Sequence, residues 1–402
     1  MASYSDLLKT PGVARIIAAQ LTARFPSGML SLAFLLHVER QTGSYGAAGL
    51  VLAATSVGQA VAGPLTSRLM GRFGMRSVLI TTLIFCVTAI TAIGVLPLTV
   101  PLYMVLGLIA GLATPPVQPA VRTIYPKMVN ARQLTPLFSL DASAQEIIWV
   151  VGPVVTTFVS TQIGTVWGIL LAAVIMVGGG IWFIASPELG RVRIPRSKRR
   201  FGVVLSRPPV LLATLVGFLL VGGVAAIEAG VVAVFGHDGS EAGLVLAIFA
   251  IGSLVGGLGL GHVPIGPWSS ARRMLIVLFG TALAALAMDF WWLSLTLFIA
   301  GVGIAPAFAV LFSIVSASVK FSDTAEAFGW VGTGQLIGAA LGSAVAGFLI
   351  DGVGAQGAFW AAIAFAALGV LAASFGSPWH PDLRGRDASP MPDTEPIQVT
   401  PS

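Results

Sequence analysis

Three ionisable side chains lie within long apolar stretches of this sequence, namely Arg24, Glu146 and Glu228. A charge in hydrocarbon is costly, so it usually pairs with an opposite charge, faces water or performs a function. A carboxylate can bind a proton or a cation, and a guanidinium can bind an anion or neutralise a carboxylate. The three residues are therefore candidates for proton coupling or substrate binding, and a purely structural ion pair is the alternative.

Arg24 and Glu146 are predicted to lie at one depth. If their helices start near Arg15 and Leu137, each is roughly 14 Å along its helix at ~1.5 Å per residue, near the middle of a hydrocarbon layer ~30 Å thick. We therefore expect them to form a charge-compensated pair in which Glu146 is the proton-responsive member, because desolvation and a guanidinium act oppositely on a carboxyl. Asp141, only four residues into that helix, is expected at headgroup level or against the basic loop that follows residue 67.

Other side chains that could contact a substrate are Gln118, Trp149, Trp330 and Gln335. Gln118 follows Pro115 and Pro116, which remove helical hydrogen-bond donors. This break is either a simple kink or a place where the freed carbonyls coordinate a substrate. Packing is the alternative role for the other three. The glycines and alanines around Glu228 either allow close helix packing or line a cavity.

The composition is that of an integral membrane protein. Of 402 residues 56% are hydrophobic and 9% are charged, with a mean hydropathy of +0.93, which is more apolar surface than one soluble core can bury. The net charge of +6 comes from short clusters between apolar runs, so it indicates membrane topology and not nucleic-acid binding. One cysteine, four histidines and no phosphate-binding loop argue against an enzyme, and neither cofactor nor metal is expected.

A helix needs about 20 residues to span a membrane, and on that measure twelve helices are predicted. Trp291 and Trp292 read as an interfacial belt between the ninth and tenth. The expected spans are 13–37, 46–67, 77–97, 100–122, 137–160, 164–186, 210–235, 241–262, 274–294, 296–319, 325–350 and 355–376.

The basic residues define the orientation. With twelve crossings, all of them except Arg24 and Arg40 fall on one side, which the positive-inside rule makes cytoplasmic. The sequence therefore predicts a multi-pass protein of the inner (plasma) membrane with both termini cytoplasmic. Its expected parts are an amino-terminal six-helix bundle (1–186), a basic linker (187–209), a carboxy-terminal six-helix bundle (210–376) and a disordered, proline-rich tail (377–402).

The two halves repeat. Residues 48–53 and 242–247 share the order Ala-Gly-Leu-Val-Leu-Ala, and Ile-Ala-Gly at 109–111 recurs at 299–301. Gln145 and Gln335 also occupy matching places in the two halves, and they are separated by the same number of residues as the two Ile-Ala-Gly segments. Matches in three helix pairs at nearly one offset indicate a duplicated six-helix unit, the plan of a transporter that rocks about a central site.

On these features the chain resembles the major facilitator superfamily over about residues 10–376. The loop Ser67-Arg68-Leu69-Met70-Gly71-Arg72-Phe73-Gly74-Met75-Arg76 is similar to the family's cytoplasmic signature. Arg72, Gly74 and Arg76 match that signature, and together with Arg68 we assign them to a gating loop. Gly71 replaces the aspartate that joins a charge latch in the family. Gly152 and Pro153 resemble the core of the antiporter motif, with Ile148 in place of a glycine.

The resemblance implies a secondary transporter that works by alternating access. We expect a monomer in the lipid bilayer that exports a small organic molecule in exchange for protons and binds no nucleic acid. An importer or uniporter of a sugar or metabolite is the alternative within this class. A non-transporting scaffold or a membrane-embedded enzyme is the alternative outside it, and the pattern does not identify the substrate.

Overall fold

The computed structural model describes residues 4–197, 199–236, 240–385 and 388–393. Apart from an isolated bridge between Lys320 and Met391, this part of the chain consists of helices and loops. The helices of the first half are α1 (Tyr4–Lys9), α2 (Val13–Arg24), α3 (Ser27–Thr42), α4 (Tyr45–Phe73), α5 (Met75–Val95), α6 (Val100–Leu112), α7 (Val117–Ile124), α8 (Ala131–Ala144), α9 (Glu146–Gln162), α10 (Thr165–Ala185) and α11 (Pro187–Arg191).

The second half has fewer and longer helices. They are α12 (Pro208–Phe235), α13 (Ser240–Leu260), α14 (Ser269–Ala284), α15 (Phe290–Val302), α16 (Ile304–Ser318), α17 (Thr324–Val353) and α18 (Gln356–Phe375). Short 3-10 turns cover 125–127, 203–206, 321–323 and 377–379.

Several spans are interrupted. Helices α2 and α3 form one span broken at Phe25 and Pro26, and α6 and α7 form one broken at Thr114–Pro116. Proline cannot donate the backbone hydrogen bond, so each break falls where the sequence places one. In the described residues eleven spans are long and apolar enough to cross a membrane. Helix α14, with 16 residues, is the short counterpart of the ninth predicted helix, so the twelve-helix fold is confirmed.

The predicted boundary between the ninth and tenth helices is wrong. Helix α14 ends at Ala284, and Trp291 and Trp292 lie in the first turn of α15. The carboxylate of Asp289 accepts a hydrogen bond from the backbone N–H of Trp292 at 3.0 Å, which caps α15 there. The apolar run continues through this turn, so hydropathy alone extended the ninth helix too far.

The prediction of a disordered tail is wrong for residues 377–385 and 388–393. Met391 exchanges backbone hydrogen bonds with Val319 and Phe321, and the N–H of Leu383 donates to Ile265. Leu383 and Ala388 are buried, because these apolar side chains dock on the second half. Residues 386–387 and 394–402 lie outside the described residues.

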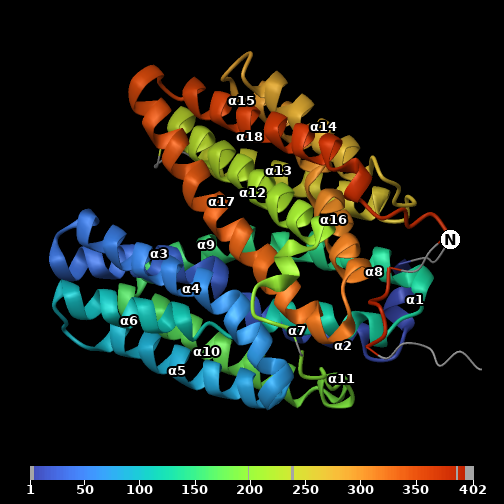
Figure 1. Cartoon of the computed structure of the whole chain (residues 1–402). Coiled ribbons are helices and arrows are strands. Elements are labelled where there is room, and N and C mark those ends of the chain that lie inside the picture. Colours follow the sequence, from blue (N-terminus) through green and yellow to red (C-terminus); the bar gives the residue numbers. More distant parts are fainter. Residues whose placement is uncertain (1–3, 198, 237–239, 386–387, 394–402) are drawn as a thin grey trace, which may run out of the picture.

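The helices form two lobes that meet at one end (Figure 1). Helices α3–α6 and α10 lie in one lobe, and α12, α14, α15, α17 and α18 lie in the other. We call the joined end the basic end, because it carries the arginine- and lysine-containing segments 68–76, 122–132 and 272–273 and the linker residues 191–197 and 199–207. Both described chain ends, at Tyr4 and Asp393, also lie there, through contacts with Gly257 and Ser322.

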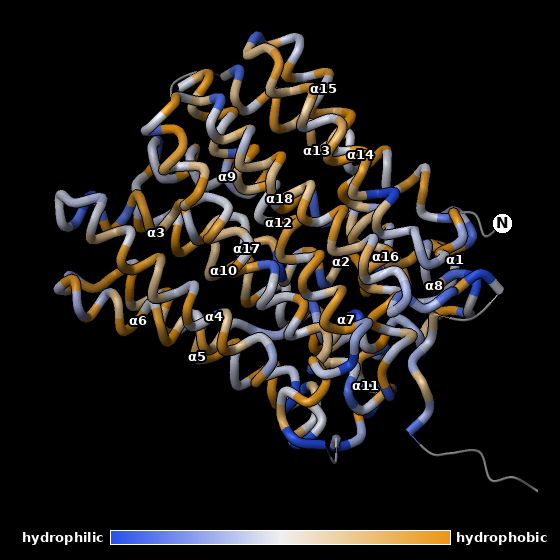
Figure 2. The backbone as a smooth tube through the Cα atoms, turned by 45° about the horizontal axis from the view of Figure 1, so that its top comes forward, coloured by the Kyte–Doolittle hydropathy of each residue, from blue (hydrophilic) through white to orange (hydrophobic). Residues whose placement is uncertain are grey.

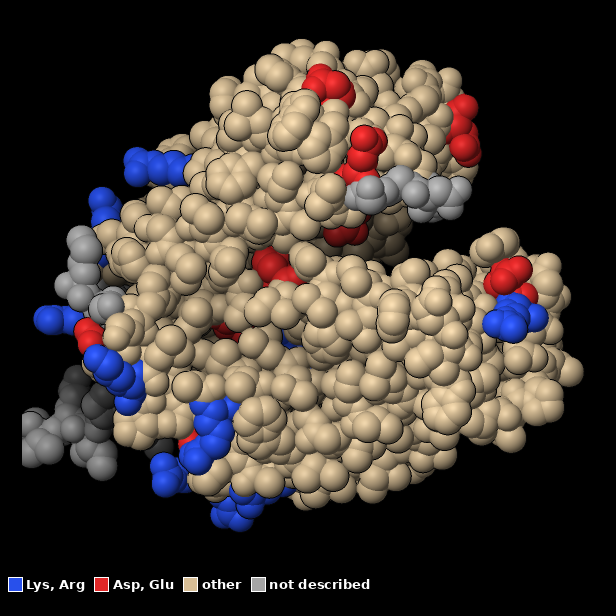
Figure 3. All heavy atoms as spheres, turned by 180° about the vertical axis from the view of Figure 1, so that it is seen from behind, with Lys and Arg blue, Asp and Glu red and all other residues tan. Residues whose placement is uncertain are grey.

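A cleft separates the lobes at the other end. The space-filling view shows the hollow opening away from most of the arginine and lysine side chains, with acidic side chains visible inside it (Figure 3). Hydrophilic segments gather at the basic end, whereas the helices are mostly hydrophobic (Figure 2). The contacts that close the basic end include a near approach of α4 and α17, where a Cβ on Gly329 would lie 2.6 Å from the carbonyl oxygen of Gly63.

Candidate functional site

Arg24 is held in a polar cluster within the first half. It is the last residue of α2, directly before the break at Pro26. Its Nη1 donates to Oε1 of Gln20 at 2.8 Å, and its Nη2 donates to Oε1 of Gln145 at 2.8 Å. Nη1 also lies 3.6 Å from a carboxylate oxygen of Asp141, and the Arg24 side chain is 13% exposed.

Asp141 is the centre of this cluster and is fully buried. It accepts hydrogen bonds from Gln20 Nε2 at 3.0 Å, Arg122 Nε at 3.1 Å and the Tyr125 hydroxyl at 3.2 Å. The buried Arg122 guanidinium also lies 3.4 Å from the centre of the Phe312 ring, a cation–π contact with the second half.

Gln118 completes the cluster from the first turn of α7. With its amide oxygen turned toward the guanidiniums, it accepts from Arg122 Nη2 at 2.7 Å and from Arg24 Nη2 at 3.3 Å. The proline break before α7 is what brings this turn against α2. We call the group the guanidinium cluster; its members are Gln20, Arg24, Gln118, Arg122, Tyr125, Asp141 and Gln145.

The predicted pair of Arg24 with Glu146 is wrong, because the partner of Arg24 is Asp141. The reason lies at the start of α8, which begins at Ala131 and not near Leu137. Asn130 caps it by accepting from the N–H of Gln133, whose side chain bonds back to Asn130. Asp141 is therefore roughly 15 Å along its helix and not at headgroup level. The Asn-x-x-Gln capping box was the sequence signal for this.

Glu146 instead faces the second half. Its Oε1 accepts a hydrogen bond at 3.0 Å from the Ser253 hydroxyl of α13. Glu228 of α12 is near enough to Glu146 to interact with it electrostatically. The Glu228 carboxylate makes no hydrogen bond or ion pair with any described residue. The interaction with Glu146 places Glu228 on the side of α12 that faces the first half. We call Glu146 and Glu228 the acidic pair.

Three predicted contact residues are placed apart from one another. Trp149, one turn beyond Glu146, is 55% exposed. Trp330 packs on Phe201 of the linker with ring centres 5.7 Å apart, so it belongs to the basic end. Gln335 lies against Gly217 of α12, within the second half. Only Trp149 lies beside the acidic pair.

Gly152 has a packing role in this structure. A Cβ on Gly152 would lie 2.8 Å from the backbone carbon of Gly28, so the α3 and α9 backbones touch through two glycines. Pro153 follows it inside α9. That Gly152 and Pro153 form an antiporter motif stays a prediction.

The gating loop is joined to the linker and to α17. Arg68 forms an ion pair with Glu326 at 2.7 Å, and the other carboxylate oxygen of Glu326 accepts from the N–H of Gly202 at 2.7 Å. Arg199 lies 3.6 Å from Asp323, which also accepts from Ser197 at 2.6 Å. We call these six residues the linker latch: Arg68, Ser197, Arg199, Gly202, Asp323 and Glu326.

The other loop residues have separate roles. Arg72 stacks on Phe73, 5.0 Å from the ring centre, and Arg76 donates to the carbonyl of Ser186 at 3.4 Å. Gly74 has φ +88°, a backbone conformation that favours glycine at the turn between α4 and α5. In place of the missing aspartate, Gly71 packs beneath the carbonyl oxygen of Pro195.

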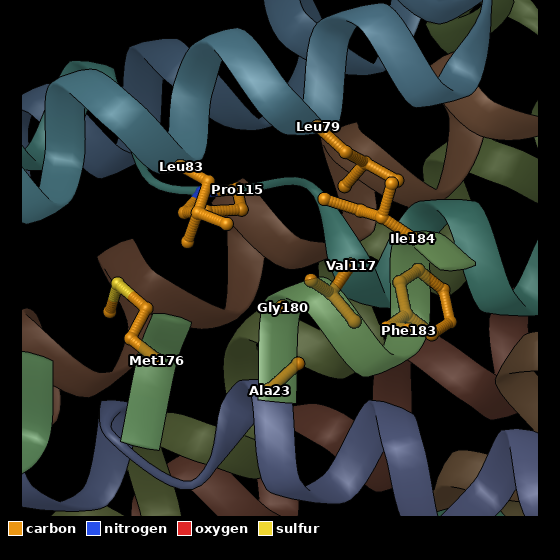
Figure 4. Close-up of a pocket in the computed structure, with 9 residues that line it drawn as sticks. All are labelled: Ala23, Leu79, Leu83, Pro115, Val117, Met176, Gly180, Phe183 and Ile184. Atoms are coloured by element: carbon orange, nitrogen blue, oxygen red, sulfur yellow. The ribbon is translucent and has the colours of Figure 1, made fainter. Parts of the chain in front are cut away.

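An apolar pocket in the first half is too small for a substrate. It is lined by Leu79 and Leu83 of α5, Ala23 of α2, Pro115, Val117 of α7 and four residues of α10 (Figure 4). Its volume is about 10 Å³, room for about one water molecule. Among the described residues no group of three or more histidines, cysteines or acids could hold a metal ion.

Comparison with known proteins points to one family. The family model described as Major Facilitator Superfamily matches residues 16–288 and 224–395. No curated protein matches the chain.

The fold is similar to those of several solved transporters. A bacterial homologue of the iron transporter ferroportin in an outward-facing state has a TM-score of 0.74 at 13% identity, covering 91% of this chain and 99% of that one. The proton:xylose symporter XylE has 0.70 at 14% identity, covering 94% and 97%. The human organic anion transporter MFSD10 has 0.69 at 16% identity, covering 90% and 100%.

Proposed function

Because the chain belongs to the Major Facilitator Superfamily and is therefore a multi-pass membrane transporter, we propose that it exports a small organic molecule in exchange for protons. The basic end faces the cytoplasm of the inner (plasma) membrane, which the positive-inside rule supports. In that orientation the cleft is open to the outside. Transport requires the linker latch to open and the other end to close.

The acidic pair is the observation that carries this proposal. Glu146 belongs to the first half and Glu228 to the second, and the two carboxylates lie near each other where the halves meet. Ionised, the pair can bind a cationic group of the substrate; protonated, it cannot. Protons and substrate then compete for one site, which is the requirement for exchange.

The guanidinium cluster has a different role in transport. Its guanidiniums are already bonded to Asp141, Gln20, Gln118 and Gln145, so they position the start of α9 and hold a fixed positive charge behind the acidic pair. Trp149 offers a ring to the substrate from one turn away.

Flux in proteoliposomes tests the proposal. A panel of organic cations, anions and neutral sugars is assayed with and without an imposed pH gradient, using wild type, Glu146→Gln, Glu228→Gln and the control Glu241→Gln, an exposed acid at the start of α13. We expect gradient-driven cation export to be lost in the first two variants and kept in the control. Uphill sugar uptake with the gradient would instead establish an importer, and uphill export with an unchanged pH dependence in both variants would refute the role of the acidic pair.

A further inference from the structure

A cavity of about 740 Å³ lies at the basic end, outside the cleft. One wall is α4, which contributes Leu65, Arg68, Leu69 and Arg72. The other wall is the linker, which contributes Arg196, Ser197, Arg199 and Phe201. A single water needs far less room, so the volume suits a molecular group.

The charge of the lining is strongly positive. Four arginines line the cavity and no acid does. Two of them are neutralised from outside, since Arg68 pairs with Glu326 and Arg199 with Asp323. In the described part of the chain, Arg72 and Arg196 have no carboxylate within ion-pair distance, so two positive charges remain uncompensated across one cavity.

Guanidinium groups recognise phosphate well. The planar group offers two parallel N–H donors that fit two phosphate oxygens, and it is less strongly hydrated than an ammonium. Two unpaired arginines on opposite walls can therefore hold one phosphate between them.

The remaining lining residues point to the source of that phosphate. Leu65, Arg68, Leu69 and Arg72 share one face of α4, because residues three and four apart lie side by side on a helix. Leu65 is 43% exposed and Phe201 is 49% exposed. Apolar side chains thus lead out of the membrane region into a basic cavity, which matches the order of acyl chain and headgroup in a phospholipid.

We propose that this cavity binds the phosphate group of an anionic phospholipid from the leaflet at the basic end. Basic pockets beside membrane helices suit such headgroups. Ser197 and Arg199 line the cavity and also bind Asp323, directly before α17. A lipid seated here therefore ties the linker to α4 while the same linker residues hold the start of α17.

Native mass spectrometry of the delipidated protein tests the site with phosphatidylglycerol and phosphatidylcholine of equal acyl chains. We expect wild type to retain phosphatidylglycerol selectively. Arg72→Gln with Arg196→Gln should weaken that binding roughly 25-fold, since each arginine near an anionic membrane surface is worth about fivefold. Arg72→Lys with Arg196→Lys keeps the charge and should lie between the two.

The matched control is Arg191→Gln with Arg193→Gln, which removes the same charge from the same linker outside the cavity. It should bind phosphatidylglycerol within about twofold of wild type. Equal loss in the control and cavity variants, or equal retention of the two lipids by wild type, would overturn the proposal.

A competition experiment with inorganic phosphate distinguishes a lipid from a free phosphate compound as the ligand. We expect it to leave bound phosphatidylglycerol in place at millimolar concentration. Displacement of the lipid by phosphate, with the same dependence on Arg72 and Arg196, would overturn the lipid as the ligand and assign the cavity to a free phosphate compound.

Discussion

Asp141 accepts hydrogen bonds from Gln20, Arg122 and Tyr125 and lies beside Arg24. It is fully buried, so it is the carboxylate that both guanidiniums share. Its removal leaves two positive charges in a site from which water is largely excluded.

Asp141→Asn should therefore destabilise the protein by roughly 3–5 kcal/mol, the cost of breaking a buried ion pair. The control is Asp351→Asn, the same change at an exposed residue near the end of α17. Yield of monodisperse protein and thermal unfolding by size-exclusion chromatography measure the effect. Adding Arg122→Met to Asp141→Asn should restore part of the loss, because one of the two charges is then gone. Equal unfolding temperatures for Asp141→Asn and Asp351→Asn would contradict this account.

The sequence predicted some of the buried charges but not which of them meet. Arg24, Glu146 and Gln118 were identifiable as polar groups in apolar runs, and all three lie near the central site. Depth along a helix follows from the rise per residue, whereas a partner also depends on where the helix starts and which way it is rotated. Arg122 and Gln20 were missed for that reason, and Asp141 was placed at the wrong depth.

The ends of the helices, too, could be predicted only in part from the sequence. The apolar runs predicted the number and order of the helices, because twenty apolar residues have few other places to go. Two ends were set instead by capping side chains, Asn130 before α8 and Asp289 before α15. A cap is one hydrogen bond and does not alter a hydropathy average.

The contact of α3 with α9 gives a prediction for these elements. A Cβ on Gly28 would lie 2.2 Å from the carbonyl oxygen of Ile148, so Gly28→Ala must push the helices apart and should cost roughly 1–3 kcal/mol, as overpacking does. Gly178→Ala in α10 is the control, since a Cβ there meets nothing within 4 Å; alanine should be neutral or stabilising by up to about 1 kcal/mol. The difference in unfolding temperature between the two variants is the measurement, and no difference would show that the helices are not in close contact.

At the scale of the molecule, the internal repeat predicted two similar halves, but no pattern showed which end of the cleft is closed. Both ends are built from the same helices, so the difference lies in contacts that form and break. The linker latch joins α4, the linker and the start of α17. The linker was predicted as a basic connection, and its hydrogen bonds with Asp323 and Glu326 could not be read from its composition.

Glu326→Gln should loosen the basic end, because it weakens charge-assisted hydrogen bonds with Arg68 and Gly202. Such bonds contribute roughly 1.5–3 kcal/mol each, so the ratio of open to closed forms should rise at least about tenfold. Spin labels at Ser77→Cys and Arg272→Cys, in a Cys86→Ala background, report the distance between the halves at this end.

The control for that measurement is Asp382→Asn. It removes an acid at the same end, where, among the described residues, Asp382 forms an ion pair with Arg384 of the tail alone. Its distance distribution should match that of wild type. A Glu326→Gln distribution that also matches wild type would mean that the latch does not hold this end closed.

The guanidinium cluster also makes the molecule sensitive to membrane potential. Two arginines share one aspartate, so with the acidic pair protonated the centre of the protein carries one net positive charge. While the cleft is open, most of the voltage drop falls across the closed basic end; when access changes, the drop moves to the other side of the cluster. That charge thus crosses much of the electric field without moving far, an effect of up to ~2.3 kcal/mol per 100 mV. A potential negative at the basic end therefore favours the conformation open at that end, and a potassium diffusion potential across proteoliposomes should shift the two distance populations accordingly.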